Sequence, residues 1–161
     1  MESLFFSNTD IFIRLAVAMS LGMLVGVERL LAQKTAGMRT YALVAMGSSL
    51  FVIISEMMIA SRGDLIGLDP LRMASQIVVG VGFLGAGLIV FKDERVVGLT
   101  SASGLWVAAG IGVAAGFGLF WLSIMATILT LFIFTVLWFI EEYLKRFSRY
   151  KNNSTNNTDT L

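Results

Sequence analysis

The sequence predicts an all-α membrane protein, a bundle of five transmembrane helices, and two observations carry this prediction. The chain of 161 residues is 57% hydrophobic and only 14% charged, whereas about a quarter of the residues in an ordinary soluble domain are charged. The chain also contains five apolar segments close to the roughly 20 residues that a helix needs to cross a bilayer. These segments cover residues 11–27, 41–60, 73–91, 99–117 and 119–140.

Small residues spaced four apart mark the first, third and fourth segments as packing helices, and those of the third segment are Gly82 and Ala86. The first segment carries Gly22 and Gly26, and the fourth carries Gly112 and Gly116. Residues four apart lie on one face of a helix, and small side chains let a second helix approach closely within lipid. The fifth segment, residues 119–140, has no glycine and many bulky side chains, so we expect it to face lipid.

The third segment contains the most unusual stretch of the chain, with four glycines at Gly80, Gly82, Gly85 and Gly87. In water these glycines would weaken a helix, but in a bilayer they permit close helix contact. We therefore expect the first, third and fourth segments to form the inner core. A local break in the third helix, exposing backbone amides and carbonyls, is the alternative. The stretch also matches a dinucleotide-binding string, but no strand–turn–helix unit surrounds it.

Basic residues predict the orientation of the chain. They concentrate in the connection after the first segment, in the connection after the third, and near the C-terminus. Cytoplasmic loops are enriched in Lys and Arg, so the N-terminus is predicted outside and the C-terminus in the cytoplasm. Insertion in both orientations is the alternative. Residues 1–145 would form the membrane domain, and the polar residues 146–161 would form a disordered cytoplasmic tail.

Composition argues against several function classes. The net charge is +1, which gives no basic field for nucleic acid. The chain lacks cysteine and histidine, and therefore lacks the usual zinc ligands and the commonest general base. No serine has a histidine partner, so we expect neither an enzyme nor a bound cofactor.

A charged cluster is predicted on the cytoplasmic side, with the Glu28 carboxylate held between Arg29, Arg39 and the start of the fourth helix. A hydroxyl at Thr100 or Ser101 would cap that helix. Juxtamembrane charge that only sets topology is the alternative. The candidate residues of this cluster are Glu28, Arg29, Lys34, Arg39, Thr40 and Thr100.

A second polar group is predicted on the outer side, comprising Asp69, Arg72 and Gln76. Asp69 followed by Pro70 is typical of a helix start, and Gln76 would need a partner inside the membrane. Arg14 could pair with Glu56 or extend to the interface. Outer carboxylates could hold a hydrated Mg²⁺, although scattered acids more often do not. The sequence alone does not decide between a metal site and none.

An ordered series of short motifs covers residues 10 to about 140. The main motifs are Gly26-Val27-Glu28-Arg29, Ala36-Gly37-Met38-Arg39-Thr40, Asp69-Pro70-x-Arg72, Gln76-Ile77-Val78-x-Gly80-Val81-Gly82-Phe83-Leu84-Gly85-Ala86-Gly87 and Trp106-x-x-Ala109-x-Ile111-Gly112. In this series the chain resembles the MgtC/SapB family. A departure occurs at residues 100–104, where Thr-Ser-Ala-Ser-Gly stands in place of the family's Thr-Thr-Ala-Ala-Ser.

The resemblance implies a multi-pass protein of the bacterial cytoplasmic membrane, linked to magnesium homeostasis. It also implies action through membrane partners, among them the F-type ATP synthase, and the chain is similar to short family members that lack a soluble C-terminal domain. We therefore expect a homo-oligomeric regulator in contact with lipid. A small magnesium channel or transporter is the alternative, in which Glu28, Arg39, Gln76 and Thr100 would line one cavity.

Overall fold

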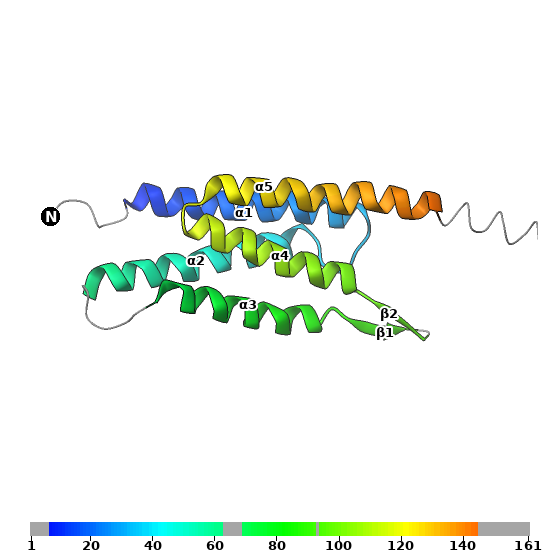
Figure 1. Ribbon diagram of the computed structural model, residues 1–161, viewed down its shortest axis with the longest axis horizontal. Coiled ribbons are helices and arrows are strands. Elements are labelled where there is room, and N and C mark those ends of the chain that lie inside the picture. The colour runs from blue at the N-terminus through cyan, green and yellow to red at the C-terminus, as the bar shows by residue number, and fades with distance from the viewer. Residues whose placement is uncertain (1–6, 63–68, 93, 145–161) are drawn as a thin grey trace, which may run out of the picture.

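The computed structural model describes residues 7–62, 69–92 and 94–144, which form helices and one short hairpin (Figure 1). Their order places one α-helix after another, with the hairpin between the third and fourth. The elements are α1 (Asn8–Leu31), α2 (Met38–Arg62), α3 (Pro70–Ala86), β1 (Val90–Lys92), β2 (Arg95–Val97), α4 (Leu99–Gly116), α5 (Phe120–Phe132) and the π-helical segment η1 (Ile133–Leu137), which continues α5.

The helices alternate in direction along the long axis of the molecule. In Figure 1, α1, α3 and α5 run one way, while α2 and α4 run the other way. The hairpin, the connection between α1 and α2 and the far end of α5 therefore share one end, which we call the hairpin end. The turn between α4 and α5 and the beginnings of α1 and α3 lie at the opposite end, which we call the Arg14 end.

Four of these helices are long and apolar enough to cross a membrane: α1, α2, α4 and the continuous helix Phe120–Leu144. The third, α3, is shorter because the chain leaves the helix at Gly87 and enters a hairpin. The apolar run to residue 91, predicted as one span, therefore ends in β1, where Val90 pairs with Val97. At the return to α4, Gly98 has a φ of 93°, and a side chain there would overlap the backbone of Leu88.

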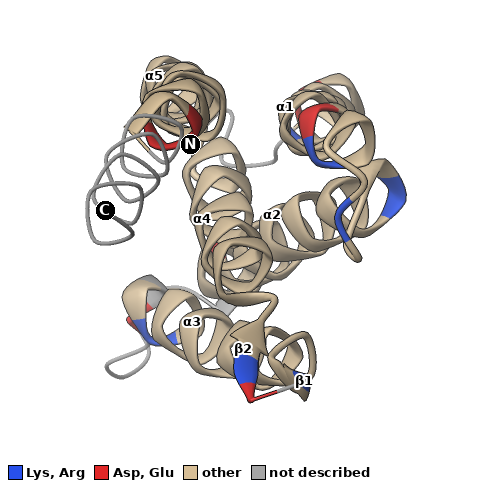
Figure 2. Cartoon of the chain, turned by 90° about the vertical axis from the view of Figure 1, so that its right-hand side faces the viewer, with Lys and Arg blue, Asp and Glu red and all other residues tan. Residues whose placement is uncertain are grey.

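Helix α4 lies at the centre of the bundle and contacts the other four helices, with one face left exposed (Figure 2). Its glycines allow this position, because a Cβ at Gly112 would overlap the backbone of Ala45 on α2. A Cβ at Gly116 would lie 2.9 Å from the carbonyl oxygen of Ser49. Close backbone approach of this kind replaces the hydrophobic drive that helices lack in lipid.

Helix α1 joins the same contact through its own glycines. A Cβ at Gly22 would lie 2.7 Å from both the Cβ of Ala45 and the carbonyl oxygen of Tyr41, and a Cβ at Gly26 would overlap Met38. Helices α1, α2 and α4 therefore form the closest contact of the bundle. The prediction that the third segment belongs to the core is confirmed in part, because Ile77 and Val81 of α3 are buried in it. The closest glycine contacts are made with α2, which was not expected there.

Helix α3 packs at the side of the bundle rather than inside it. A Cβ at Gly80 or Gly82 would meet no atom within 4 Å, and one at Gly85 would make an ordinary contact of 3.6 Å with Ala102 on α4. Gly87 lies at the end of the helix as its C-cap. Gly80 and Gly82 therefore do not make the predicted close helix contact with any described residue.

Candidate functional site

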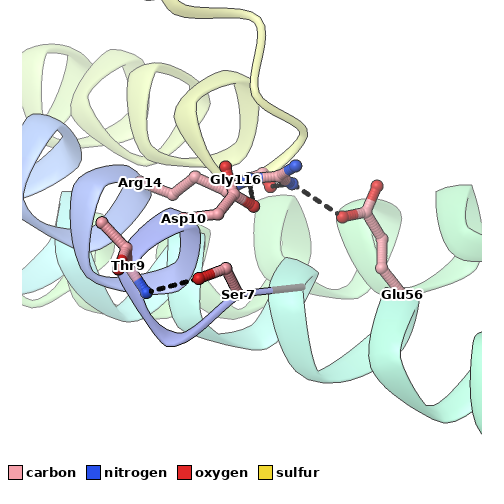
Figure 3. Close-up of polar contacts among 6 residues, drawn as sticks. All are labelled: Ser7, Thr9, Asp10, Arg14, Glu56 and Gly116. Carbon is pink, nitrogen blue, oxygen red and sulfur yellow. Dashed lines mark hydrogen bonds and ion pairs between the residues drawn. The ribbon is translucent and has the colours of Figure 1, made fainter. Parts of the chain in front are cut away.

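Arg14 ties three helices together at the Arg14 end (Figure 3). Its Nε lies 2.9 Å from Oδ2 of Asp10, one turn earlier on α1. Its Nη1 donates to Oε2 of Glu56 on α2 at 2.9 Å and to the carbonyl oxygen of Gly116 on α4 at 2.7 Å. The pairing with Glu56, one of two alternatives open from the sequence, is the one that forms.

The surroundings of Arg14 explain why a charge is tolerated here. The side chain of Arg14 is 13% exposed and that of Glu56 is 24% exposed, and charges withdrawn from water near a membrane need partners. The residue facing the guanidinium is Gly118, whose φ is 73°. A Cβ at Gly118 would lie 3.4 Å from Nη2 of Arg14, so the α4–α5 turn closes directly over the charge.

Arg29 is the buried cation of the hairpin end, with only 4% of the residue exposed. The Glu28 carboxylate accepts from two of its nitrogens, from Nε and, at 2.7 Å, from Nη2. The guanidinium also lies 3.6 Å from the centre of the Phe134 ring, close enough for a cation–π interaction. The pair is thus neutralised on one side and covered by an aromatic face on the other.

Phe134 reaches Arg29 from the π-helical segment η1. Segments of this kind are rare and occur often at functional sites. Gly104 on α4 makes room for the ring, because a Cβ there would lie 2.5 Å from Cζ of Phe134 and 2.7 Å from the hydroxyl of Tyr41. The buried Tyr41 hydroxyl donates to the carbonyl oxygen of Ser101 at 3.0 Å, joining α2 to α4.

The structure brings together two of the six predicted residues of the cytoplasmic cluster. Glu28 bonds to Arg29, but the side chains of Lys34, Arg39, Thr40 and Thr100 are exposed. The predicted hydroxyl cap is wrong, because Gly98 occupies the N-cap of α4 and no side chain caps it. Phe134 and Tyr41 were missed, since a single aromatic residue in an apolar helix carries no signal of its partner.

On the outer side, Asp69 and Pro70 start α3 as predicted, but the predicted outer residues do not form one site. Oδ1 of Asp69 accepts from the backbone N–H of Leu71 at 2.9 Å, with Pro70 opening α3. Arg72 is exposed, and Gln76 faces a groove between α3 and α2. Among the described residues, no group of three or more acidic, histidine or cysteine side chains could hold a metal ion.

The groove between α2 and α3 is open and has a volume of about 520 Å³. Its walls are almost wholly apolar, and a glycine lies on each side of it. The principal residues are Leu43, Gly47 and Phe51 on α2, and Gln76, Gly80 and Leu84 on α3. Since no side chain projects from Gly47 or Gly80, the two glycines keep the groove open.

The sequence of the chain is similar to the sequences of a known protein family. The model of the MgtC family matches residues 15–143, which include most of α1 and all of α2, α3, α4 and α5. The chain belongs to the MgtC family. Within this family it is 43% identical over 131 residues to YhiD of Escherichia coli K12, a protein named as a candidate magnesium transporter. It is 46% identical over 119 residues to the protein MgtC of Salmonella typhimurium LT2.

These MgtC-family relatives are longer than the chain. The YhiD match covers 80% of this chain and 61% of YhiD, and the MgtC match covers 74% of this chain and 48% of MgtC. A Haemophilus influenzae Rd protein is 35% identical over 91% of this chain and 63% of its own length. The chain thus spans less than two thirds of each of these relatives. No solved structure matches it.

Proposed function

We propose that this MgtC-family chain is a regulator of magnesium homeostasis that acts by binding membrane partners rather than by conducting an ion. The name of YhiD connects a relative of the chain to magnesium. One observation favours a regulator over a channel. The four residues expected to line an ion path, Glu28, Arg39, Gln76 and Thr100, do not come together.

A channel requires polar side chains from several helices along one path. Glu28 is turned onto Arg29, and Gln76 faces the apolar groove. Arg39 and Thr100 are exposed near the hairpin end. The contact between α1, α2 and α4 is closed by Gly22, Gly26, Gly112 and Gly116 with no room for a further atom, let alone a hydrated ion.

We infer a five-span arrangement in the bacterial inner membrane, with the N-terminus outside and the C-terminus in the cytoplasm. The alternating helix directions support it, because α3 must return the chain from the Arg14 end to the hairpin end (Figure 1). The 17 residues of α3 lie at the short limit for a span. The basic residues of the α1–α2 connection would then lie in the cytoplasm.

The partner surface that we favour is the face of α3 turned away from the bundle. Val79 and Phe83 are 68% and 83% exposed, and Gly82 and Ala86 lie beside them four residues apart. Small residues at this spacing promote helix association in lipid. A second copy of the chain or another membrane protein, such as the F-type ATP synthase, would bind there.

Transport of magnesium is the second candidate function, supported by the name of YhiD. The test that separates the two is Mg²⁺ uptake into liposomes that contain the purified protein, with Glu28→Gln as the comparison. A regulator gives no flux above empty liposomes, whereas flux that the Glu28→Gln protein loses would make the chain a transporter and overturn the proposal. The folded state of each protein is checked by circular dichroism.

Partner binding is tested directly in native membranes. The chain has no cysteine, so Gly82→Cys introduces one reactive thiol on the proposed surface. Gly110→Cys is the matched control, because Gly110 is also exposed and a Cβ there meets nothing within 4 Å. We expect a specific cross-linked product from Gly82→Cys alone; equal products from both variants would remove α3 as the partner surface.

A further inference from the structure

We propose that the groove between α2 and α3 binds one acyl chain of a phospholipid whose anionic headgroup is held by Arg39. This lipid site is independent of the regulatory function proposed above and of the outward face of α3. Three features of the groove carry it: its size, its length and position along α2, and the charge at its mouth.

The size and lining of the groove suit an acyl chain. The groove has a volume of about 520 Å³ and is open along one side. An acyl chain is much narrower than a helix and needs no polar partner. The almost wholly apolar walls, with Gly47 and Gly80 recessed between larger side chains, suit such a chain.

The length of the groove is close to the depth of one leaflet, and one of its ends faces the hairpin end. On α3 it extends from Met73 to Leu84, about 16 Å at about 1.5 Å per residue, and half of a bilayer's hydrocarbon core is about 15 Å thick. On α2 it extends from Leu43 to Phe51, and Leu43 lies five residues from the start of α2 at the hairpin end. A lipid lying in it would therefore place its headgroup at that end.

The mouth of the groove carries an uncommitted positive charge. Arg39 is exposed and lies one turn before Leu43 on α2, on the face that lines the groove. The first turn of α2 has no acidic residue, and the Glu28 carboxylate at the end of α1 is engaged by Arg29. The β1–β2 turn contains two basic and two acidic residues in sequence, so it contributes no net charge. An anionic phosphate is the complement of this site.

Native mass spectrometry of the full chain measures the affinity for the first bound lipid. The probes are dioleoylphosphatidylglycerol and dioleoylphosphatidylcholine, which share acyl chains and differ in charge. We expect the protein to bind the anionic lipid roughly fivefold more tightly, the preference that one basic residue near the headgroups confers. Arg39→Gln should abolish the preference while leaving binding of the neutral lipid unchanged. Equal affinity for both lipids, or a preference that survives in Arg39→Gln, would overturn the headgroup assignment.

Gly80→Leu tests the groove itself, because its side chain would project into open space and the fold has no atom within 4 Å to displace. We expect it to weaken binding of both lipids at least tenfold. Gly110→Leu, on the exposed face of α4, should bind as the unmodified chain does. Wild-type affinity in Gly80→Leu would overturn the proposal. So would disulfide-linked dimers of Gly80→Cys that persist in excess lipid, since a second copy would then fill the groove.

Discussion

Glycine has opposite roles in the contact between α1, α2 and α4 and in helix α3. At Gly112 an added Cβ would overlap the α2 backbone, whereas at Gly80 it would meet nothing within 4 Å. In the core, glycine permits two backbones to approach; on α3, glycine leaves a surface and a groove open. Glycine content alone therefore does not locate the core of a membrane bundle, because what faces each glycine decides its role.

The largest effect should come from filling the core contact. Gly112→Leu would drive a side chain into the backbone of Ala45, and overpacking that neither helix can relieve should cost more than about 3 kcal/mol. We expect little or no folded protein by size-exclusion chromatography after extraction. Gly110→Leu, two residues away and open to its surroundings, should elute normally. Normal elution of Gly112→Leu would show that α2 and α4 are not in close contact.

Loss of the Arg14 network should be the next largest effect. Arg14→Gln removes the ion pairs with Asp10 and Glu56 and the bond to the Gly116 carbonyl. Since it leaves the Glu56 carboxylate without its partner, it should lower the free energy of unfolding by about 2 kcal/mol. Detergent titration followed by circular dichroism measures this value. In the double variant Arg14→Gln/Glu56→Gln, part of the loss should return; additive losses would mean that the two side chains do not interact.

The hairpin end should respond more weakly. Phe134→Leu keeps an apolar side chain but removes the ring over Arg29, and we expect a loss of about 1 kcal/mol in the same titration. Phe132→Leu is the matched control, because Phe132 lies in the same helix and is 55% exposed. Similar losses in the two variants would assign the effect to volume alone rather than to the contact with Arg29.

The smallest effect should come from α3. Gly82→Ala adds one methyl group where no atom lies within 4 Å, and alanine favours the helix over glycine by about 1 kcal/mol. A slight gain in the free energy of unfolding is therefore expected for the monomer. A loss that grows with protein concentration would instead show that a second copy covers this face, and would sharpen the contrast with the core.

The sequence predicted where the helices lie along the chain better than it predicted which helices contact one another. Apolar length identified α1, α2 and α4, and small residues spaced four apart marked α1 and α4 as packing helices, because these signals lie within one segment. The end of α3 was missed because Val90 and Phe91 are as apolar in a strand as in a helix. The side position of α3 was missed for a similar reason: glycine spacing shows that a helix can be approached closely, not that anything approaches it.

The candidate site shows the same division. The Glu28–Arg29 ion pair could be predicted because the two residues are adjacent in sequence. The Arg14–Glu56 ion pair could be predicted as one alternative because both residues were expected on the outer side. The contact of Arg29 with Phe134 joins residues more than a hundred positions apart and depends on the local π-helical turn of η1. No pattern within either segment encodes that turn or the direction of the ring.

The most direct test of the contrast between the two regions compares Gly112→Ala with Gly80→Ala in one detergent titration. A single methyl group is added in each case, so only the surroundings differ. We predict that Gly112→Ala lowers the free energy of unfolding by about 2 to 3 kcal/mol, while Gly80→Ala leaves it unchanged or raises it slightly. Equal losses at the two positions would contradict the account, because they would show that Gly80 is packed as tightly as Gly112.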